Sequence, residues 1–218
     1  MEKIIVFGAG GHAKAVIDVI EKAGLYEITG ILDSYKTPGS VMYGYEILGD
    51  EQVIANRGEQ INGGIIAIGD NYIRSQVVSR MTSLYPDFSF ISAVHPSASV
   101  AKGAIIGQGS VIMAGAVIGS DTIIGNHSIL YSKASVDHDS TLGEFVTLAP
   151  NTATGGDVHI GAYSVISIGA NVIHSRVIGE HTVIGAGSTV ISDLPGYCVA
   201  YGTPARMIRT RQAGERYL

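Results

Sequence analysis

The sequence predicts an α/β domain of the Rossmann-like type over residues 1–88, a parallel β-helix over residues 89–195 and a tail over residues 196–218. Three observations support this prediction. An aliphatic residue recurs at every sixth position from Val94 to Val190. Small residues and glycines hold fixed places within that repeat, and the first part of the chain alternates short apolar runs with a glycine-rich turn and a helix-like segment.

The N-terminal segment has the pattern of strand, turn, helix and strand that opens a parallel α/β sheet. Ligands of such sheets bind at the carboxyl ends of the strands. Gly24 is expected to end the helix, since glycine is common directly after a helix. The expected elements are a buried strand over residues 3–8, a glycine turn over 8–14, a helix over 13–23, a second strand over 26–33 and a third strand that ends at Gly69.

The glycine turn, Gly8-Ala-Gly-Gly-His-Ala-Lys14, leaves three interpretations open. It departs from the dinucleotide motif G-x-G-x-x-G because Ala13 takes the third glycine position, so it argues only weakly for NAD. A glycine turn at a helix N-terminus would equally cradle another phosphate. The turn could also serve only to pack the helix against the strand.

The six-residue repeat is the strongest signal in the chain. Of the seventeen positions from 94 to 190 in steps of six, sixteen are Ile, Leu or Val, and the exception is Thr154. This period fits neither a helix stripe nor a plain alternating strand. It fits short strands joined by turns, three to a coil, with the aliphatic side chains stacked inside a solenoid of between five and six coils.

Two further columns accompany the aliphatic one. Four residues after each aliphatic residue the side chain is usually small, as at Ala98, Ser110 and Ser128. We expect the glycines beside the aliphatic column to provide the positive φ that tight corners need. Glycine directly follows the aliphatic residue at positions 107, 119, 125, 143, 155, 161, 179 and 185.

Composition and charge argue against several classes of protein. The net charge is −5 and the Lys and Arg residues do not cluster, which disfavours binding to nucleic acid. The single cysteine, Cys198, allows no internal disulfide and fits a reducing compartment. The start lacks the pattern of a signal peptide, and no apolar run approaches the roughly 18 residues of a membrane span. The sequence therefore predicts a cytoplasmic protein with no membrane span.

The repeat and the tail motif Tyr201-Gly-Thr-Pro-Ala-Arg206 together resemble the hexapeptide acyltransferases. The resemblance implies a left-handed β-helix and a homotrimer with active sites between subunits. It also implies that acetyl-CoA binds as co-substrate along the groove between neighbouring coils. Such solenoids also occur as scaffolds and in carbonic anhydrases, so the fold alone does not determine the function.

A narrower resemblance covers essentially the whole chain. The glycine turn, the later Ile68-Gly-Asp-Asn71 and the coils are together similar to the sugar acetyltransferases of the bacillosamine, perosamine and sialic acid pathways. In these relatives the N-terminal domain holds a nucleotide sugar, and here the Asp33 carboxylate could accept hydrogen bonds from ribose or base. The implied substrate-binding residues are Gly11, His12, Ala13, Asp33, Ser34 and Gly69.

Acetyl transfer needs a base for the proton of the nucleophile and donors for the tetrahedral oxyanion. His138 differs from the other histidines because Asp137 and Asp139 flank it, and either carboxylate could orient its ring. The resemblance makes His138 the implied base and Asp139 its partner, although many relatives have Glu at that place. We expect solvated corners for His127, His159 and His181, and a structural place for His95.

The coil length of eighteen residues places Gly156 beside His138, one coil further along the chain. The same stretch holds Thr154, and a local departure from a regular pattern is typical of a functional site. The resemblance implies that the backbone N–H of Gly156 meets the thioester oxygen. It further implies acetyl-CoA contacts at Thr147, Ile168 and Ala186, candidate contacts to the CoA phosphates at Arg206 and Arg209, and no metal.

These features favour an acetyl-CoA-dependent N-acetyltransferase of surface-polysaccharide or glycan biosynthesis. Its expected acceptor is a nucleotide-linked 4-amino-4,6-dideoxy sugar, with UDP as the favoured nucleotide, and His138 would deprotonate the sugar amine for direct attack. The alternatives are O-acetylation of sialic acid or a related sugar hydroxyl, a nucleotide-sensing scaffold with an idle β-helix, and an NAD-dependent enzyme.

Overall fold

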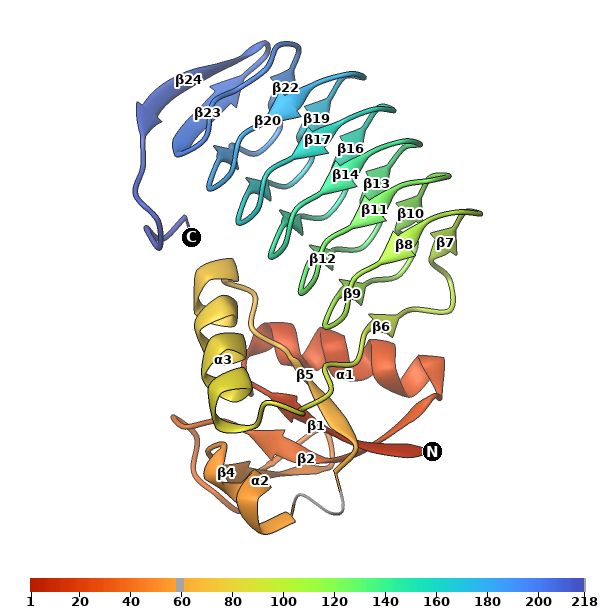
Figure 1. Ribbon diagram of the computed structural model, residues 1–218, viewed down its shortest axis with the longest axis vertical. Coiled ribbons are helices and arrows are strands. Elements are labelled where there is room, and N and C mark those ends of the chain that lie inside the picture. The colour runs from red at the N-terminus through yellow and green to blue at the C-terminus, as the bar shows by residue number, and fades with distance from the viewer. Residues whose placement is uncertain (58–60, 218) are drawn as a thin grey trace.

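The computed structural model describes residues 1–57 and 61–217 and places an α/β domain at one end of a long stack of coils (Figure 1). The α/β domain contains a sheet in the order β3-β4-β2-β1-β5, in which only β3 runs antiparallel to its neighbour. Its strands are β1 (Glu2–Phe7), β2 (Tyr26–Leu32), β3 (Val41–Met42), β4 (Tyr45–Gly49) and β5 (Gly63–Ile66). Its helices are α1 (Gly11–Ala23), α2 (Gln52–Arg57) and α3 (Asn71–Leu84).

The predicted first strand, first helix and second strand are confirmed. Gly24 ends α1 as expected, with a left-handed φ of 64° and its N–H bonded to the carbonyl of Ile20. The predicted end of the third strand is wrong, because β5 ends at Ile66 and Gly69 lies beyond it. The chain leaves the sheet early to begin α3, and the Asp70 carboxylate caps that helix by accepting the N–H of Ile73.

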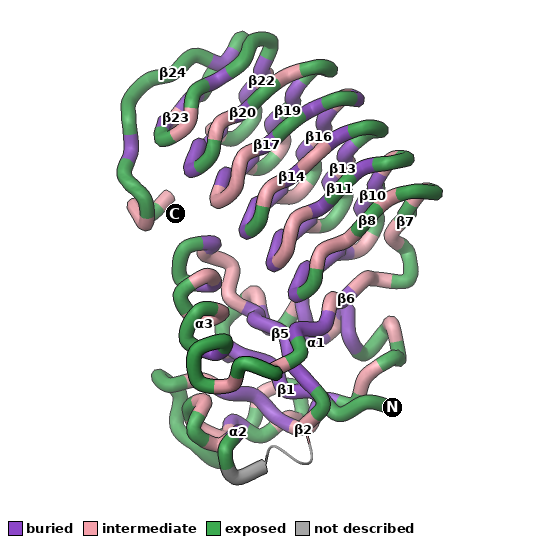
Figure 2. Tube along the Cα trace, viewed as in Figure 1, coloured by how far each residue is buried: buried purple, intermediate pink, exposed green. Residues whose placement is uncertain are grey.

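Apolar clusters cover both faces of the sheet. One cluster, around Phe7, Ile66 and Met81, packs α2 and α3 on the sheet. The other packs α1 on the sheet and also includes Val111 and Ile129 of the β-helix. Buried segments therefore run from β1 and β5 through β6 into the first coils (Figure 2). The two domains share a continuous core, which holds them in a fixed relation.

The coils confirm the predicted six-residue register. Within the described residues, seventeen two-residue strands form three parallel sheets, and each strand pairs with the strand eighteen residues away. Sheet one contains β6 (Ala93–Val94), β9 (Val111–Ile112), β12 (Ile129–Leu130), β15 (Thr147–Leu148), β18 (Val165–Ile166) and β21 (Val183–Ile184). Sheet two contains β7 (Ser99–Val100), β10 (Val117–Ile118), β13 (Ser135–Val136), β16 (Ala153–Thr154), β19 (Asn171–Val172) and β22 (Thr189–Val190). Sheet three contains β8 (Ile105–Ile106), β11 (Ile123–Ile124), β14 (Thr141–Leu142), β17 (His159–Ile160) and β20 (Val177–Ile178).

The aliphatic column fills the interior of the coils, where residues such as Ile112, Leu130 and Ile166 are fully buried. The Ser and Thr members of the small-residue column form hydrogen bonds between coils. Ser128 is one example, because its hydroxyl donates to the carbonyl of Gly143 at 3.1 Å. Short side chains at this place therefore satisfy backbone groups that larger apolar side chains would cover.

The expected reason for the glycine column is wrong. None of these eight glycines has a positive φ; the left-handed position lies two residues later and is occupied by residues such as Asp121, His127 and Phe145. A Cβ at Gly143 would instead lie 2.5 Å from the backbone nitrogen of Ala162 in the next coil. Glycine is needed at these eight positions because the neighbouring segment of chain approaches too closely there for a side chain.

Thr154 breaks the aliphatic column inside sheet two. Its side chain points into the core, and its buried hydroxyl has no hydrogen-bond partner among the described residues. Thr154→Val keeps the shape and removes the unsatisfied group, so we expect the free energy of unfolding to rise by about 1–3 kcal/mol. Urea denaturation measures this change. The matched control, Val136→Thr one coil earlier, should destabilise, and equal effects of the two variants would contradict the expectation.

The tail adds a hairpin to sheet one. β23 (Cys198–Gly202) pairs in parallel with β21, and β24 (Ala205–Thr210) returns antiparallel to β23. The chain then runs back to α3, where the hydroxyl of Tyr217 donates to the carbonyl of Gly69 (Figure 1). Cys198 is buried. No helix in the described part of the chain is long and apolar enough to span a membrane.

Candidate active site

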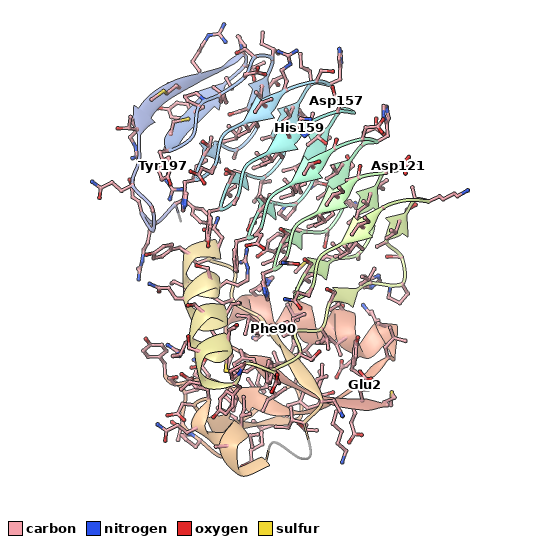
Figure 3. The ribbon with its side chains drawn as sticks, viewed as in Figure 1. Glu2, Phe90, Asp121, Asp157, His159 and Tyr197 are labelled. Atoms are coloured by element: carbon pink, nitrogen blue, oxygen red, sulfur yellow. The ribbon has the colours of Figure 1, made fainter. Side chains whose placement is uncertain are left out.

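His138 lies on the corner that joins sheet two to sheet three, which we call the base corner. The non-glycine left-handed residues of this corner are Asp121, Asp139, Asp157 and Ser175, and Figure 3 labels Asp121 and Asp157, one coil to either side of Asp139. The Nδ1 atom of His138 lies 2.7 Å from a carboxylate oxygen of Asp139. Asp137 has a different task, because its carboxylate accepts the backbone N–H of His138 at 2.8 Å. Asp139, not Asp137, therefore holds the ring.

The arrangement affects the basicity of His138. The hydrogen bond to Asp139 raises the pKa of His138 above its ordinary 6.5, and the charge of Asp137 adds to that rise. With Nδ1 directed to a carboxylate, the neutral ring carries its proton on Nδ1 and leaves Nε2 free to accept one. This is the geometry of a base with an orienting partner.

Gly156 lies directly beside the His138 ring, as the coil length predicts. A Cβ at Gly156 would lie 2.6 Å from Nε2 and 2.6 Å from Cε1 of His138. The backbone N–H of Gly156 donates to no acceptor in the described residues. An imidazole ring with a free nitrogen thus covers a buried glycine whose backbone donor is unused.

The predicted CoA contacts lie elsewhere on the β-helix. Ile168 and Ala186 are exposed and stack one coil apart on the corner that joins sheet one to sheet two, where the N–H of Gly187 donates to the carbonyl of Ile168. Thr147 lies on sheet one and is buried, with its hydroxyl 3.4 Å from Nη2 of Arg74. Within one chain, the structure therefore brings none of the three to His138. In the tail, Arg206 is exposed and Arg209 forms an ion pair with Glu215.

The carboxyl ends of β1, β2 and β5 form a second region, which we call the acceptor edge. A cavity of about 200 Å³ opens there, lined by Gly8, Asp33, Ser34, Gln76 and Arg80 among others. An open hollow of about 440 Å³ lies over the glycine turn and is flanked by two lysines, Lys14 and Lys36. These lysines and Arg80 are not among the predicted site residues, although Lys14 belongs to the glycine-turn motif.

The predicted substrate residues differ in what they offer a ligand. The backbone at Gly11 faces open space, because a Cβ there would meet no atom within 4 Å. The Asp33 carboxylate already accepts the N–H groups of Ala9 and Tyr35, both at 2.8 Å, so it shapes the loops. Ala13 is fully buried, and its side chain serves packing. Ser34 is exposed, and it lines the smaller cavity.

His12 and Gly69 link the acceptor edge to the β-helix. The burial of His12 lowers its pKa to about 4, and its Nδ1 atom lies 3.0 Å from the hydroxyl of Tyr131. A Cβ at Gly69 would lie 3.3 Å from the same hydroxyl. Both residues are therefore held against the β-helix from the N-terminal domain.

The corner between sheets three and one carries a stack of rings, the aromatic corner. Its members, in chain order, are His127, Phe145, Tyr163, His181 and Tyr197, with centroids 4.6 to 5.1 Å apart. His159 is half exposed as expected, but it lies on strand β17 and not at a corner. The expectation of solvated corners is wrong for His127 and His181, which are buried in the stack. Figure 3 labels Tyr197 at one end and Phe90, whose ring meets that of His127 edge-on, at the other.

A large open cleft of about 880 Å³ lies beside the contact between α3 and the aromatic corner and is lined by Tyr72, Gln76 and Arg80 of α3. Neither this cleft nor the cavity at the acceptor edge is lined by His138. Among the described residues, no group of three or more His, Cys, Asp or Glu side chains is placed to hold a metal ion.

Comparisons with known proteins match both domains. A family model described as the PglD N-terminal domain matches residues 3–81, and one described as bacterial transferase hexapeptide (six repeats) matches residues 103–138. These matches agree with a left-handed β-helix behind an α/β domain. Comparison with curated proteins finds no match.

Several solved structures are similar over nearly the whole chain. GDP-perosamine N-acetyltransferase from Caulobacter crescentus, solved as a histidine-to-alanine mutant with CoA and GDP-perosamine, has a TM-score of 0.90 and 34% identity over 96% of this chain and 98% of that chain. The acetyltransferase domain of PglB from Neisseria gonorrhoeae, solved with acetyl coenzyme A, has a TM-score of 0.87 and 35% identity over 95% and 99%. WeeI from Acinetobacter baumannii has a TM-score of 0.83 and 23% identity over 95% and 100%, which supports the fold.

Proposed function

Because this chain belongs to the family of hexapeptide-repeat sugar acetyltransferases with a PglD-type N-terminal domain, and is thus an acetyltransferase, we propose that it acetylates the amine of a nucleotide-linked amino sugar. Acetyl-CoA is the donor, and a 4-amino-4,6-dideoxy sugar is the acceptor. The observation that carries the proposal is the His138 ring, which Asp139 holds directly over Gly156, a residue whose backbone N–H has no acceptor among the described residues.

In the proposed mechanism, acetyl-CoA supplies the acetyl group as a thioester. His138 takes a proton from the sugar amine through Nε2 as the amine nitrogen bonds to the carbonyl carbon, and Asp139 stabilises the resulting imidazolium. The N–H of Gly156 donates to the oxygen that becomes negative. His138 then returns the proton to the departing sulfur, which leaves the amide and free CoA.

The proposed acceptor site is the acceptor edge. Gly11 offers open backbone at the start of a thirteen-residue helix, where an anion is favoured by the helix dipole, and Lys14 and Lys36 flank the same hollow. These groups suit a sugar diphosphate. The sequence favours UDP as the nucleotide, whereas the Caulobacter relative is a GDP-perosamine N-acetyltransferase.

The proposed assembly is a homotrimer with active sites between subunits. His138 and Gly156 lie on the base corner, whereas Ile168 and Ala186 lie exposed on another corner of the same chain. In a trimer, the base corner of one copy can face the corner of its neighbour that carries Ile168 and Ala186. Acetyl-CoA bound between the two copies would then contact both pairs of residues. Thr147 cannot contact acetyl-CoA bound between the subunits in this way, because its side chain is buried against Arg74.

The test is acetyl transfer to a panel of UDP-, dTDP-, GDP- and CMP-linked 4-amino-4,6-dideoxy sugars, with free and CMP-linked sialic acid as the hydroxyl acceptors. Thiol release and the mass of the product are the readouts. We expect an amide with one nucleotide amino sugar and no product with the matching 4-hydroxy sugar. Product from sialic acid alone would establish O-acetylation instead, and no product from any acceptor would overturn the proposal.

The role of Asp139 predicts a pH dependence. The base works when neutral, so the rate falls as the pH drops through the pKa of His138, which Asp139 holds above 6.5. Asp139→Asn removes the charge and should move the acidic limb of kcat/KM to lower pH while reducing the maximal rate. Asp137→Asn, which leaves the ring contact intact, should move the limb less. An unshifted limb in Asp139→Asn would contradict the assignment.

A further inference from the structure

Arg74 of α3 is a fully buried charged side chain at the junction of the two domains. Burial lowers its pKa to about 10, which leaves it protonated near neutral pH. Among the described residues, no carboxylate forms an ion pair with it. A buried charge without a carboxylate is costly for stability, and a well-packed apolar side chain would often stabilise such a place better.

The guanidinium binds oxygens of both domains at once. On the N-terminal side, Nη1 donates to the carbonyls of Ile68 and Gly69 at 2.9 and 3.0 Å. On the β-helix side, Nε donates to the carbonyl of His127 at 2.9 Å, and Nη2 donates to the carbonyl of Phe145 at 3.3 Å. One planar, rigid group therefore fixes four carbonyls in a single geometry.

The two sides that Arg74 joins are the two halves of the proposed chemistry. Ile68 lines the cavity at the acceptor edge, in the loop that follows β5. Phe145 lies seven residues after His138 in the same coil, with only β14 between them. Because the coil is braced by its neighbours on both sides, fixing Phe145 also fixes the direction in which His138 faces.

Neighbouring contacts reinforce this junction. Asn71, one turn before Arg74, donates to the carbonyl of Tyr163 at 2.7 Å. Arg211 of the tail donates to the carbonyl of His181 at 3.0 Å, and the hydroxyl of Tyr217 donates to the carbonyl of Gly69. The carbonyls of the aromatic corner are thus bound, coil after coil, by side chains of α3 and the tail.

We infer that Arg74 is a positioning residue, which sets the acceptor edge relative to the coil that bears His138 so that the sugar amine arrives in line with the thioester. The inference rests on the proposed function. It applies whether the amine meets His138 of its own chain or of a neighbour, because the β-helices transmit the same fixed geometry. A displacement of about 1 Å at a reacting centre can cost on the order of 100-fold in rate.

The test compares two acceptors in Arg74→Met, which keeps the length of the side chain and removes its donors. We expect kcat for the nucleotide-linked amino sugar to fall about 100-fold. The dissociation constants of acetyl-CoA and of the nucleotide should change little. The corresponding free amino sugar is not held by the acceptor edge, so its slow transfer should be nearly unaffected. Arg74→Lys keeps the charge and some of the donors, so its kcat for the nucleotide-linked amino sugar should lie between those of the unmodified protein and Arg74→Met. Lys22→Met, an exposed change on α1, is the control.

Two results would overturn the inference: an unchanged kcat in Arg74→Met, or equal losses with both acceptors, which would indicate general damage to the fold. If Arg74→Met does not fold, the same comparison in Arg74→Lys decides, because a loss confined to the nucleotide-linked acceptor supports positioning and an equal loss contradicts it. Failure of the proposed function is distinguishable, since the unmodified protein would then acetylate no nucleotide amino sugar.

Discussion

His138→Ala is expected to lower kcat for the nucleotide amino sugar by about 10²- to 10⁴-fold, the range that a positioned general base contributes. The physical reason is local: Nε2 is the free basic atom of a ring that lies over Gly156, and Asp139 holds the ring in that position. The side chain is 58% exposed, so its removal should leave the stability and the dissociation constant of acetyl-CoA close to those of the unmodified protein.

A matched histidine provides the control for this prediction. His159 is also half exposed and lies 3.5 Å from a carboxylate oxygen of Asp157 on the next coil. His159→Ala should retain normal kcat, because the coil geometry aims this ring at no backbone donor comparable to Gly156. Steady-state kinetics and circular dichroism measure both variants. Near-normal kcat in His138→Ala, or equal losses in the two variants, would exclude His138 as the base.

The register of the coils could be predicted from the sequence because it depends on a strictly local rule. One aliphatic residue in six, repeated from 94 to 190, determines which side chains face inward, and the coil length then places Gly156 beside His138. The reason for the glycines was not predictable in the same way. It depends on the distance between coils, and the sequence alone cannot distinguish a glycine that needs a positive φ from one that needs space.

The junction between the domains was missed because its signals resemble those of other structures. Arg74 lies in the α3 sequence Asn-Tyr-Ile-Arg-Ser-Gln, which has the polar composition of an exposed helix, yet the side chain is fully buried. The aromatic corner left a signal that could have been found. Stepping by eighteen from His127 reads Phe145, Tyr163 and His181, a column of rings that a solvated corner would not require.

Gly156→Ala is the second prediction with a large expected effect. The added Cβ would lie 2.6 Å from Nε2 of His138, so the ring must rotate away and give up its contact with Asp139. Because the atoms that must move belong to an exposed side chain, the stability should change little, whereas kcat should fall on the order of 100-fold. Gly143→Ala provides the contrast. There the Cβ would meet the backbone of Ala162, and we expect this overpacking to lower the free energy of unfolding by about 1–3 kcal/mol.

A double-mutant cycle decides whether Gly156→Ala acts through His138. If the added Cβ lowers kcat by displacing the ring, Gly156→Ala should cause almost no further loss of kcat in the His138→Ala background, where there is no ring to displace. If the same fold-loss persists in that background, the added methyl acts independently of the ring, for instance by blocking the backbone N–H or the thioester. The steric account would then be wrong, although the N–H of Gly156 could still serve the oxyanion. Strong coupling would instead establish that glycine is required at 156 because the base occupies the space above it.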